Sequence, residues 1–275
     1  MILASDVDVG EFVGMVGMSS ELDGLVELAL RPWGRPQVGV ERDARPERLV
    51  ELQPSFPIPG PNRVCLVRCV PERVDALIDE VRQLVAARGL PCLWILDPDV
   101  EPADLRDRLT ARGIVPFGTA DVMVLPAGAS LESGNAAVEV VDALSDEAVY
   151  WDAEAVQAAA FDDGGPPPGQ RERYQEACAD PSRRFFLALI DGVPAGAGWA
   201  TIRDEGVLIN GGAVDPRFQG RGVYRALVAA RLRLAREVGA PGLGVQARPD
   251  TSGPILTWFG FRTVGSWSSH VDRSR

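Results

Sequence analysis

The sequence contains the stretch Val214-Asp215-Pro216-Arg217-Phe218-Gln219-Gly220-Arg221-Gly222-Val223-Tyr224, which is its most informative segment. Apolar residues before it predict a strand over residues 207–214, and apolar residues recur at helical spacing after it. The first N–H groups of a helix have no partner within the helix, and the helix dipole is positive there. Two glycines let the backbone approach an anion closely. The stretch therefore predicts a phosphate or pyrophosphate site, with a plain strand-to-helix turn as the alternative.

The order of elements around this stretch occurs twice in the chain. The first copy predicts a strand, a helix, a strand, a short helix and a strand over residues 63–70, 71–88, 91–96, 103–112 and 121–125. The second copy repeats them over residues 207–214, 223–238, 243–247 and 251–259, with a last strand through Val264. The segments that connect the helix to the next strand, AARGLP in the first copy and REVGAP in the second, are also similar.

This repetition predicts two tandem domains, each a mixed α/β unit with its own sheet flanked by helices. We place an N-terminal repeat at residues 1–130 and a C-terminal repeat at residues 136–275. The small polar stretch AGASLESGN, residues 127–135, is the predicted linker. The C-terminal repeat has additional elements in front: a strand over residues 138–141, two helices ending near residues 160 and 179, and a hairpin turning at Asp191-Gly192.

The glycine-bearing stretch resembles the coenzyme A signature Q/R-x-x-G-x-G/A of the GCN5-related N-acetyltransferase (GNAT) superfamily. It appears here as Gln219-Gly220-Arg221-Gly222-Val223-Tyr224, after the lead-in AVDPRF. The later stretch DTSGPILTWFGF, residues 250–261, resembles the helix of that family that ends in Gly-Phe. The resemblance covers roughly residues 138–272.

The resemblance implies two GNAT-like domains, each with a partly splayed sheet, and acetyl-CoA or another acyl-CoA as co-substrate. The pantetheine would lie in the splay, along the strand near residues 211–214. A backbone N–H of Ala213 or Val214 would hold the oxygen of the tetrahedral intermediate. The pyrophosphate would rest on the amides of six residues: Gln219, Gly220, Arg221, Gly222, Val223 and Tyr224.

The sequence departs from the family pattern at two positions. Tyr224 stands where the signature ends in a small residue, and Leu256 stands where many members place a tyrosine general acid. Leucine cannot donate a proton, so Ser252, Thr251, water or an unassisted thiolate are the alternatives, and no acid is assigned. Candidates for the general base are the carboxylates Glu205, Asp204 and Asp215, each of which is otherwise a solvated surface group.

Two acidic residues, Asp162 and Asp163, are candidates for acceptor binding, because the resemblance places their loop beside the acceptor site. The N-terminal repeat has Pro71, Glu72 and Asp75 at the corresponding turn and no glycine. Negative charge and a missing proline N–H oppose an anion there. We therefore expect a degenerate domain that binds no coenzyme A and that shapes the acceptor pocket or has a structural role.

Composition and net charge narrow the classes of partner and cofactor that this chain is expected to bind. The net charge of -11 disfavours nucleic acid, and no apolar run reaches the roughly 18 residues of a membrane helix. The N-terminus lacks the basic segment of a signal peptide, which indicates a cytoplasmic protein. Four cysteines without a Cys-x-x-Cys pair and a single histidine, His270, do not form a metal-site pattern. The sequence is compatible with either a monomer or a homodimer.

The leading hypothesis is an N-acetyltransferase that transfers an acetyl or other acyl group to the amine of a small molecule by direct attack. One alternative is other acyl-CoA chemistry on the same scaffold, such as O-acyl transfer or decarboxylation. Another is a non-catalytic acyl-CoA-binding protein. Turnover with a panel of amines and the identity of the product separate these hypotheses.

Overall fold

The structure is a computed structural model that describes residues 20–33, 39–54, 57–161 and 170–273. The N-terminal repeat forms α1 (Ser20–Leu30), β1 (Glu41–Arg45), β2 (Arg48–Leu52), β3 (Arg63–Cys65), η1 (Pro71–Arg73), α2 (Val74–Ala86), β4 (Cys92–Leu96), α3 (Leu105–Ala111) and β5 (Val115–Pro126). The C-terminal repeat forms β6 (Val138–Asp142), α4 (Glu147–Phe161), α5 (Gln170–Ala179), β7 (Arg183–Ile190), β8 (Val193–Arg203), β9 (Gly206–Val214), η2 (Pro216–Phe218), α6 (Val223–Glu237), β10 (Gly242–Ala247), α7 (Ser252–Trp258) and β11 (Arg262–Asp272).

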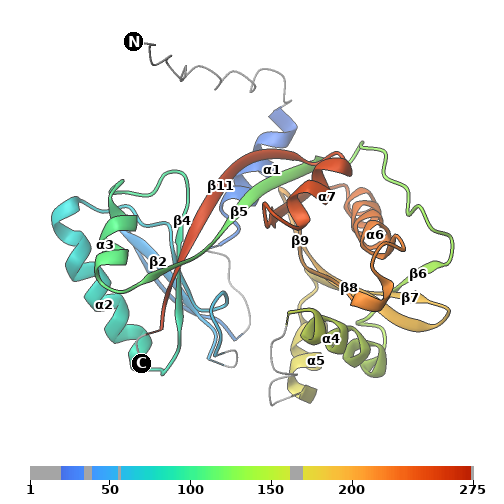
Figure 1. The fold of residues 1–275 in the computed structure, drawn as a ribbon, viewed down its shortest axis with the longest axis horizontal. Helices are drawn as coiled ribbons and strands as arrows, with labels where there is room; N and C mark the ends of the chain where they lie inside the picture. The colour runs from blue at the N-terminus through green and yellow to red at the C-terminus, as the bar shows by residue number, and fades with distance from the viewer. Residues whose placement is uncertain (1–19, 34–38, 55–56, 162–169, 274–275) are drawn as a thin grey trace, which may run out of the picture.

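The strands of both repeats join in one 11-stranded mixed sheet, in the order β1-β2-β3-β4-β11-β5-β10-β9-β8-β7-β6. Each repeat places its last strand inside the other repeat: β11 lies between β4 and β5, and β5 lies between β10 and β11. Figure 1 shows these two long strands running side by side across the middle of the molecule. The predicted mixed α/β class is confirmed, and the sheets expected for the two repeats are continuous with each other.

The two exchanged strands are longer than the sequence predicts. Strand β5 begins at Val115 instead of residue 121, and β11 continues to Asp272, well beyond Val264. The additional residues of β5 are exposed except for Ala120, and those of β11 are largely polar. They carry no run of apolar residues, which is the pattern that predicts a strand. Strand β3 is shorter than expected, because the chain leaves the sheet at Leu66, whose φ is 56°.

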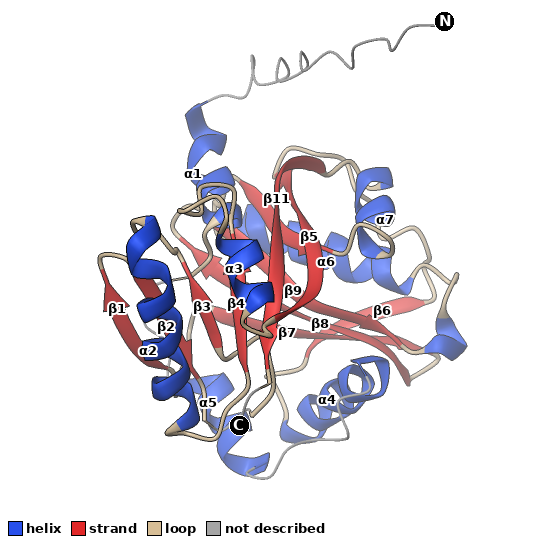
Figure 2. Cartoon of the chain, turned by 60° about the vertical axis from the view of Figure 1, so that its left-hand side comes forward, coloured by secondary structure: helices blue, strands red, loops and turns tan. Residues whose placement is uncertain are grey.

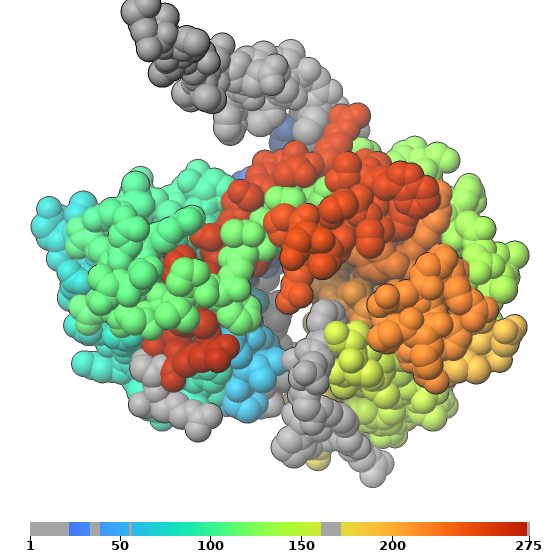
Figure 3. All heavy atoms as spheres, viewed as in Figure 1, coloured from blue at the N-terminus to red at the C-terminus, as the bar shows by residue number. Residues whose placement is uncertain are grey.

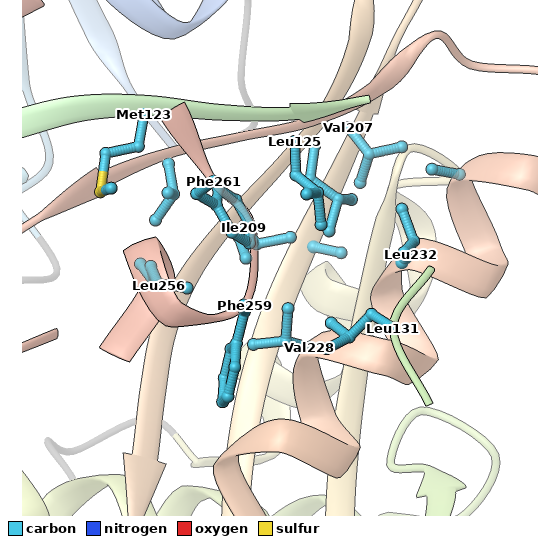
Figure 4. Close-up of a cluster of buried hydrophobic side chains, with 14 of the residues drawn as sticks. Met123, Leu125, Leu131, Val207, Ile209, Val228, Leu232, Leu256, Phe259 and Phe261 are labelled. Carbon is cyan, nitrogen blue, oxygen red and sulfur yellow. The ribbon is translucent and has the colours of Figure 1, made fainter. Parts of the chain in front are cut away.

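The main hydrophobic core lies between α6, α7 and the sheet, and it contains residues of both repeats. Met123 and Leu125 of β5 pack there against Val228, Leu256 and Phe261 (Figure 4). Leu131, from the segment predicted as a linker, is also buried in this cluster. Hydrogen bonds from Arg236 to the carbonyls of Ala127 and Ala129 fix the same segment to α6. The connection is therefore packed against the domain that follows it.

The remaining helices cover the rest of the sheet (Figure 2). Helix α4 packs on β7, β8 and β9, and α2 and α3 cover the N-terminal repeat. Helix α1, which the sequence analysis did not predict, packs Leu25 and Ala29 against Val122 and Val124 of β5, on the opposite side of that strand from α7. None of the helices in the described parts of the chain is long and apolar enough to cross a membrane.

Candidate active site

The glycine turn, residues 219–222, connects the end of β9 and the short η2 helix to the start of α6. Asp215 caps the short η2 helix by accepting hydrogen bonds from the N–H and the guanidinium of Arg217. Gly220 and Gly222 have φ values of 72° and 82°, a region that residues with a side chain rarely adopt. A Cβ atom on Gly220 would meet no atom within 4 Å. The turn is therefore exposed and open on the side where a ligand would approach.

Most amides of this turn have no partner in the described chain, whereas those of Gln219 and Arg221 donate to the carbonyls of Pro216 and Phe218. The N–H groups of Gly220, Gly222, Val223, Tyr224 and Arg225 make no hydrogen bond among the described residues, and the first helical bond runs from Ala226 to the carbonyl of Gly222. Unpaired N–H groups at the positive end of a helix are the usual means of binding a phosphate. The anion site stays a prediction, and these N–H groups are the ones available to an anion at the turn.

Beside the turn, the sheet opens between β9 and β10. Among the described residues the two strands are paired only at Val207↔Leu243 and Leu208↔Gly244, and β9 continues to Val214 with no described strand on that edge. The other edge of β9 stays paired with β8, and a bulge interrupts this pairing at Gly211 and Gly212. The Nε2 group of Gln157 on α4 donates a hydrogen bond to the carbonyl of Gly211 and holds the bulge from one face.

The second wall of this opening comes from the N-terminal repeat. Strand β5 is paired with β10 from Pro126 to Asp121, where β10 ends, and it continues to Val115 with β11 as its only recorded neighbour in the described chain. Val115 and Phe117 are large exposed apolar residues on this part of β5. Figure 3 shows the surface hollowed beside this strand, between the two repeats. The exchange of strands therefore makes both repeats border one opening.

The cofactor residues predicted from the sequence lie together at this place. Val214 ends β9, and Gln219 to Tyr224 form the turn and the first residues of α6. Because the N–H of Asp215 donates to Ala195 on β8, alternation along the strand turns the N–H of Val214 toward the opening and that of Ala213 toward β8. The N–H of Val214 therefore faces the opening and that of Ala213 faces β8, while the role of either as an oxyanion donor stays a prediction.

The predicted catalytic residues do not gather in the same way. Glu205 lies in the turn between β8 and β9, beside Gly24 of α1 and at the far end of β9 from the glycines. Asp215 is bound by Arg217, whose hydrogen bonds lower the pKa of its carboxyl below the ordinary value. The Oγ atom of Ser252 accepts a hydrogen bond from the N–H of Arg248. Asp162 and Asp163 lie outside the described residues.

Leu256, at the expected position of the acid, has no exposed surface and lies within the hydrophobic core (Figure 4). Leu256 therefore has a packing role at this position.

Two charged residues near the opening were missed by the sequence analysis. Asp121 of β5 is paired with Ala247, the last residue of β10, so it lies on the wall of the opening at the point where β10 ends. Its Oδ2 atom is 3.4 Å from the position of a Cβ on Gly253, and it makes no recorded hydrogen bond or ion pair with the described residues. Arg231 of α6 is buried against Gly198 on β8. Neither residue belongs to a sequence motif, and only the topology brings Asp121 here.

The corresponding opening in the N-terminal repeat is closed. Strands β3 and β4 are also paired at only two positions, Arg63↔Leu93 and Val64↔Trp94. The chain after β4 fills the space beyond them: Glu101 donates its N–H to Val67 and accepts the N–H of Cys69. Arg68 also binds the carboxylate of Asp97 at 2.7 Å. In the described part of this repeat, the segment around Glu101 therefore takes the place that an extended ligand would need beside residues 67–69.

Comparison with known proteins places residues 149–252 in a family. The model of the acetyltransferase (GNAT) family matches these residues, and no curated protein matches the chain. Among solved structures, a GCN5-related N-acetyltransferase from Kribbella flavida is similar with a TM-score of 0.67 and 16% identity, over 93% of this chain and 96% of its own.

Two further solved structures have the same fold. A functionally unknown conserved protein from Staphylococcus epidermidis is similar with a TM-score of 0.65 and 13% identity, over 86% of this chain and 96% of its own. A tandem GNAT protein from the clavulanic acid biosynthesis pathway is similar with a TM-score of 0.57 and 14% identity, over 90% of this chain and 87% of its own. At such low identities these likenesses show the fold alone.

Proposed function

The chain contains a GNAT acetyltransferase domain, matched at residues 149–252, and from this premise we propose that it transfers the acetyl group of acetyl-CoA to the amine of a small molecule. The observation that carries the proposal is the set of unpaired amides at Gly220 and Gly222–Arg225, directly beside the open edge of β9. A diphosphate fits the turn, and the extended pantetheine chain of the cofactor fits a strand edge with free hydrogen-bonding groups.

In this proposal the N–H of Val214 stabilises the developing negative charge on the carbonyl oxygen as the amine nitrogen attacks. The carbon–sulfur bond then breaks, and its electron pair stays on sulfur. The attacking nitrogen loses a proton and the sulfur gains one, so the step balances as amide plus free thiol. The fixed backbone of β9, paired with β8 from Gly196 to Arg203, holds this donor in place.

Transfer is tested with purified protein, acetyl-CoA and a panel of primary amines, by measuring free thiol and identifying the product by mass. An acetylated amine formed with thiol in equal amount supports the proposal. Thiol release that stays at the rate seen without any amine contradicts it, and an acetyl ester as the product assigns the scaffold to O-acyl transfer instead.

We expect Asp121 to attract and orient the acceptor amine. It is a carboxylate without a recorded partner in the described chain, and β5 places it where β10 ends. Because a carboxylate near an ammonium group favours binding and can accept its proton, Asp121→Asn should lower kcat/KM for the amine by roughly 10- to 100-fold. Steady-state kinetics with varied amine measure this effect.

The matched control for this substitution is Asp250→Asn, which removes the same charge from an exposed position shortly before α7. It should keep the kcat/KM of the parent. Equal losses in both variants would mean that Asp121 acts only through net charge and has no place at the acceptor.

We expect one molecule of acetyl-CoA to bind per chain. The glycine turn of the C-terminal repeat is open, whereas residues 97–101 occupy the opening between β3 and β4 in the N-terminal repeat. Calorimetric titration measures the stoichiometry directly. A value of two would show that the N-terminal repeat retains a site and that the role assigned to residues 97–101 is wrong.

A further inference from the structure

Arg231 is a charged side chain buried in the core without a counter-charge. Its residue is 1% exposed, and no ion pair joins it to an acid among the described residues. Its Nε atom donates to the carbonyl of Leu227 at 2.9 Å, and Nη1 donates to the carbonyl of Trp199 at 3.4 Å. The remaining nitrogen, Nη2, has no partner in the described part of the chain.

Such an arrangement is costly for folding. A buried cation loses its hydration, and here no carboxylate compensates for the loss. Burial accordingly lowers the pKa of the Arg231 guanidinium to about 10, with the nearby phenol of Tyr224 acting in the opposite direction. A leucine or methionine would fill this position at a lower cost in folding free energy. Stability therefore does not explain why the residue is charged.

The direction of the unpaired nitrogen indicates that reason. Nη2 lies 3.7 Å from the position of a Cβ on Gly212, one of the two glycines of the β9 bulge. Gly198 on β8 gives the guanidinium room, because a Cβ there would be 2.9 Å from Nη1. Arg231 therefore supports, from the α6 side, the same bulge that Gln157 holds from the α4 side.

Tyr224 lies near this cation and packs against the main hydrophobic core. It precedes Arg231 by seven residues, so both side chains are on the same face of α6. Its ring packs on Gly212, where a Cβ would be 2.8 Å from Cε2, and its centroid is 6.1 Å from that of Phe259. The ring thus extends from β9 toward the end of α7, on the α6 side of the opening. Its hydroxyl makes no recorded hydrogen bond with the described residues.

We propose that Tyr224 is the proton donor to the departing thiolate and that Arg231 is the positioning residue that stabilises the phenolate left behind. This inference rests on the proposed acyl transfer. As the carbon–sulfur bond breaks, the electron pair goes to sulfur and the phenol proton follows it. Attack by the neutral amine leaves its nitrogen positively charged, and this nitrogen gives its extra proton to the phenolate as the neutral amide forms, so no other reactant is required.

The charge environment fits these roles. Burial raises the pKa of the Tyr224 phenol, which keeps it protonated at neutral pH, and the guanidinium of Arg231 opposes this rise. A phenol that is protonated in the resting protein and has a fixed cation beside it can release a proton and recover it. The position also accounts for a tyrosine where the signature has a small residue, and for Leu256 lying in the core.

The test compares Tyr224→Phe, Arg231→Met and the parent protein. Tyr224→Phe keeps the ring and the backbone amide, so calorimetry should give an unchanged affinity for acetyl-CoA. Its kcat should fall by roughly 100-fold, and the decline of kcat at high pH, where the phenol ionises, should disappear. Tyr174→Phe, which removes a hydroxyl that donates to the carbonyl of Leu144, is the control and should keep the parent kcat.

Arg231→Met distinguishes function from packing. Without the cation the phenol ionises at higher pH, so the decline of kcat should move upward and kcat should fall. The midpoint of urea unfolding should stay the same or rise, because an unpaired buried charge has been removed. A merely structural arginine would instead give a lower midpoint with an unchanged pH profile.

A measurement without turnover follows the phenol itself. The chain has three tyrosines, so the difference between the ultraviolet titrations of the parent and Tyr224→Phe isolates Tyr224. In the Arg231→Met background this ionisation should occur at higher pH.

If Tyr224→Phe kept the kcat and the pH profile of the parent protein, the inference about Tyr224 would be overturned and the proposed function would be unaffected. A parent protein that binds acetyl-CoA and acetylates no amine would overturn the proposed function and the inference together.

Discussion

The variant Gly220→Asp is expected to lose acetyl-CoA binding by roughly 100-fold or more while it remains folded. An aspartate carboxylate in the turn would face the diphosphate that the free amides are proposed to bind. Two like charges 4 Å apart repel by about 4 kcal/mol in surroundings of intermediate dielectric, and about 1.4 kcal/mol corresponds to a tenfold change in affinity. Calorimetric titration of parent and variant with acetyl-CoA measures the loss.

The chain offers a closely matched control at the other end of the same helix. Gly239 has a φ of 71°, against 72° for Gly220, and a Cβ at either position would meet no atom within 4 Å. Gly239→Asp therefore introduces the same charge and the same backbone strain far from the turn. If Gly239→Asp weakened binding as much as Gly220→Asp, strain or net charge would be the cause, and the turn would lose its role.

The sequence predicts the C-terminal repeat well because its signals are local. The strand-turn-helix from residue 207 onward has apolar residues at the right spacing, and the glycines occur where positive φ values are needed. The cofactor residues follow from the same stretch. Helix α1 and strands β1 and β2 were missed, although α1 packs on the strands that both repeats share.

The exchange of β5 and β11 lies beyond what a single sequence reveals. Strand partners are chosen by contacts between residues far apart in the chain, and the polar end of β11 has no strand pattern of its own. The acceptor site that we propose at Asp121 depends on this exchange. Asp121 lies in the N-terminal repeat, so sequence reasoning that looked for a base within residues 138–272 could not find it.

Arg231 shows a different limit of prediction from sequence. Its position on α6 is correctly predicted as helical, but an arginine in a helix is ordinarily a solvent-exposed residue. Only the glycines on β8 and β9 make room for its burial, and their packing role appears once the strands are placed.

The variant Gly242→Ala is expected to destabilise the whole molecule by about 3 kcal/mol. Gly242 begins β10 and faces Pro126 in the pairing with β5. A Cβ there would overlap the carbonyl oxygen of Leu125 and lie 3.0 Å from its carbonyl carbon. Both are backbone atoms of a strand that is paired on both sides, so the clash cannot be relieved by a rotamer change. Urea unfolding of parent and variant measures the loss.

Because β10, β5 and β11 belong to one sheet and Met123 and Leu125 belong to the core of the C-terminal repeat, this single change should affect both repeats. We expect one unfolding transition, shifted to lower urea, with coincident circular dichroism and tryptophan fluorescence. Gly118→Ala, also on β5 and with Ser269 Oγ as its nearest atom at 4.0 Å, is the control and should leave the midpoint unchanged. Two separate transitions, with the N-terminal repeat unaffected by Gly242→Ala, would mean that the repeats fold independently and that the exchanged strands do not couple them.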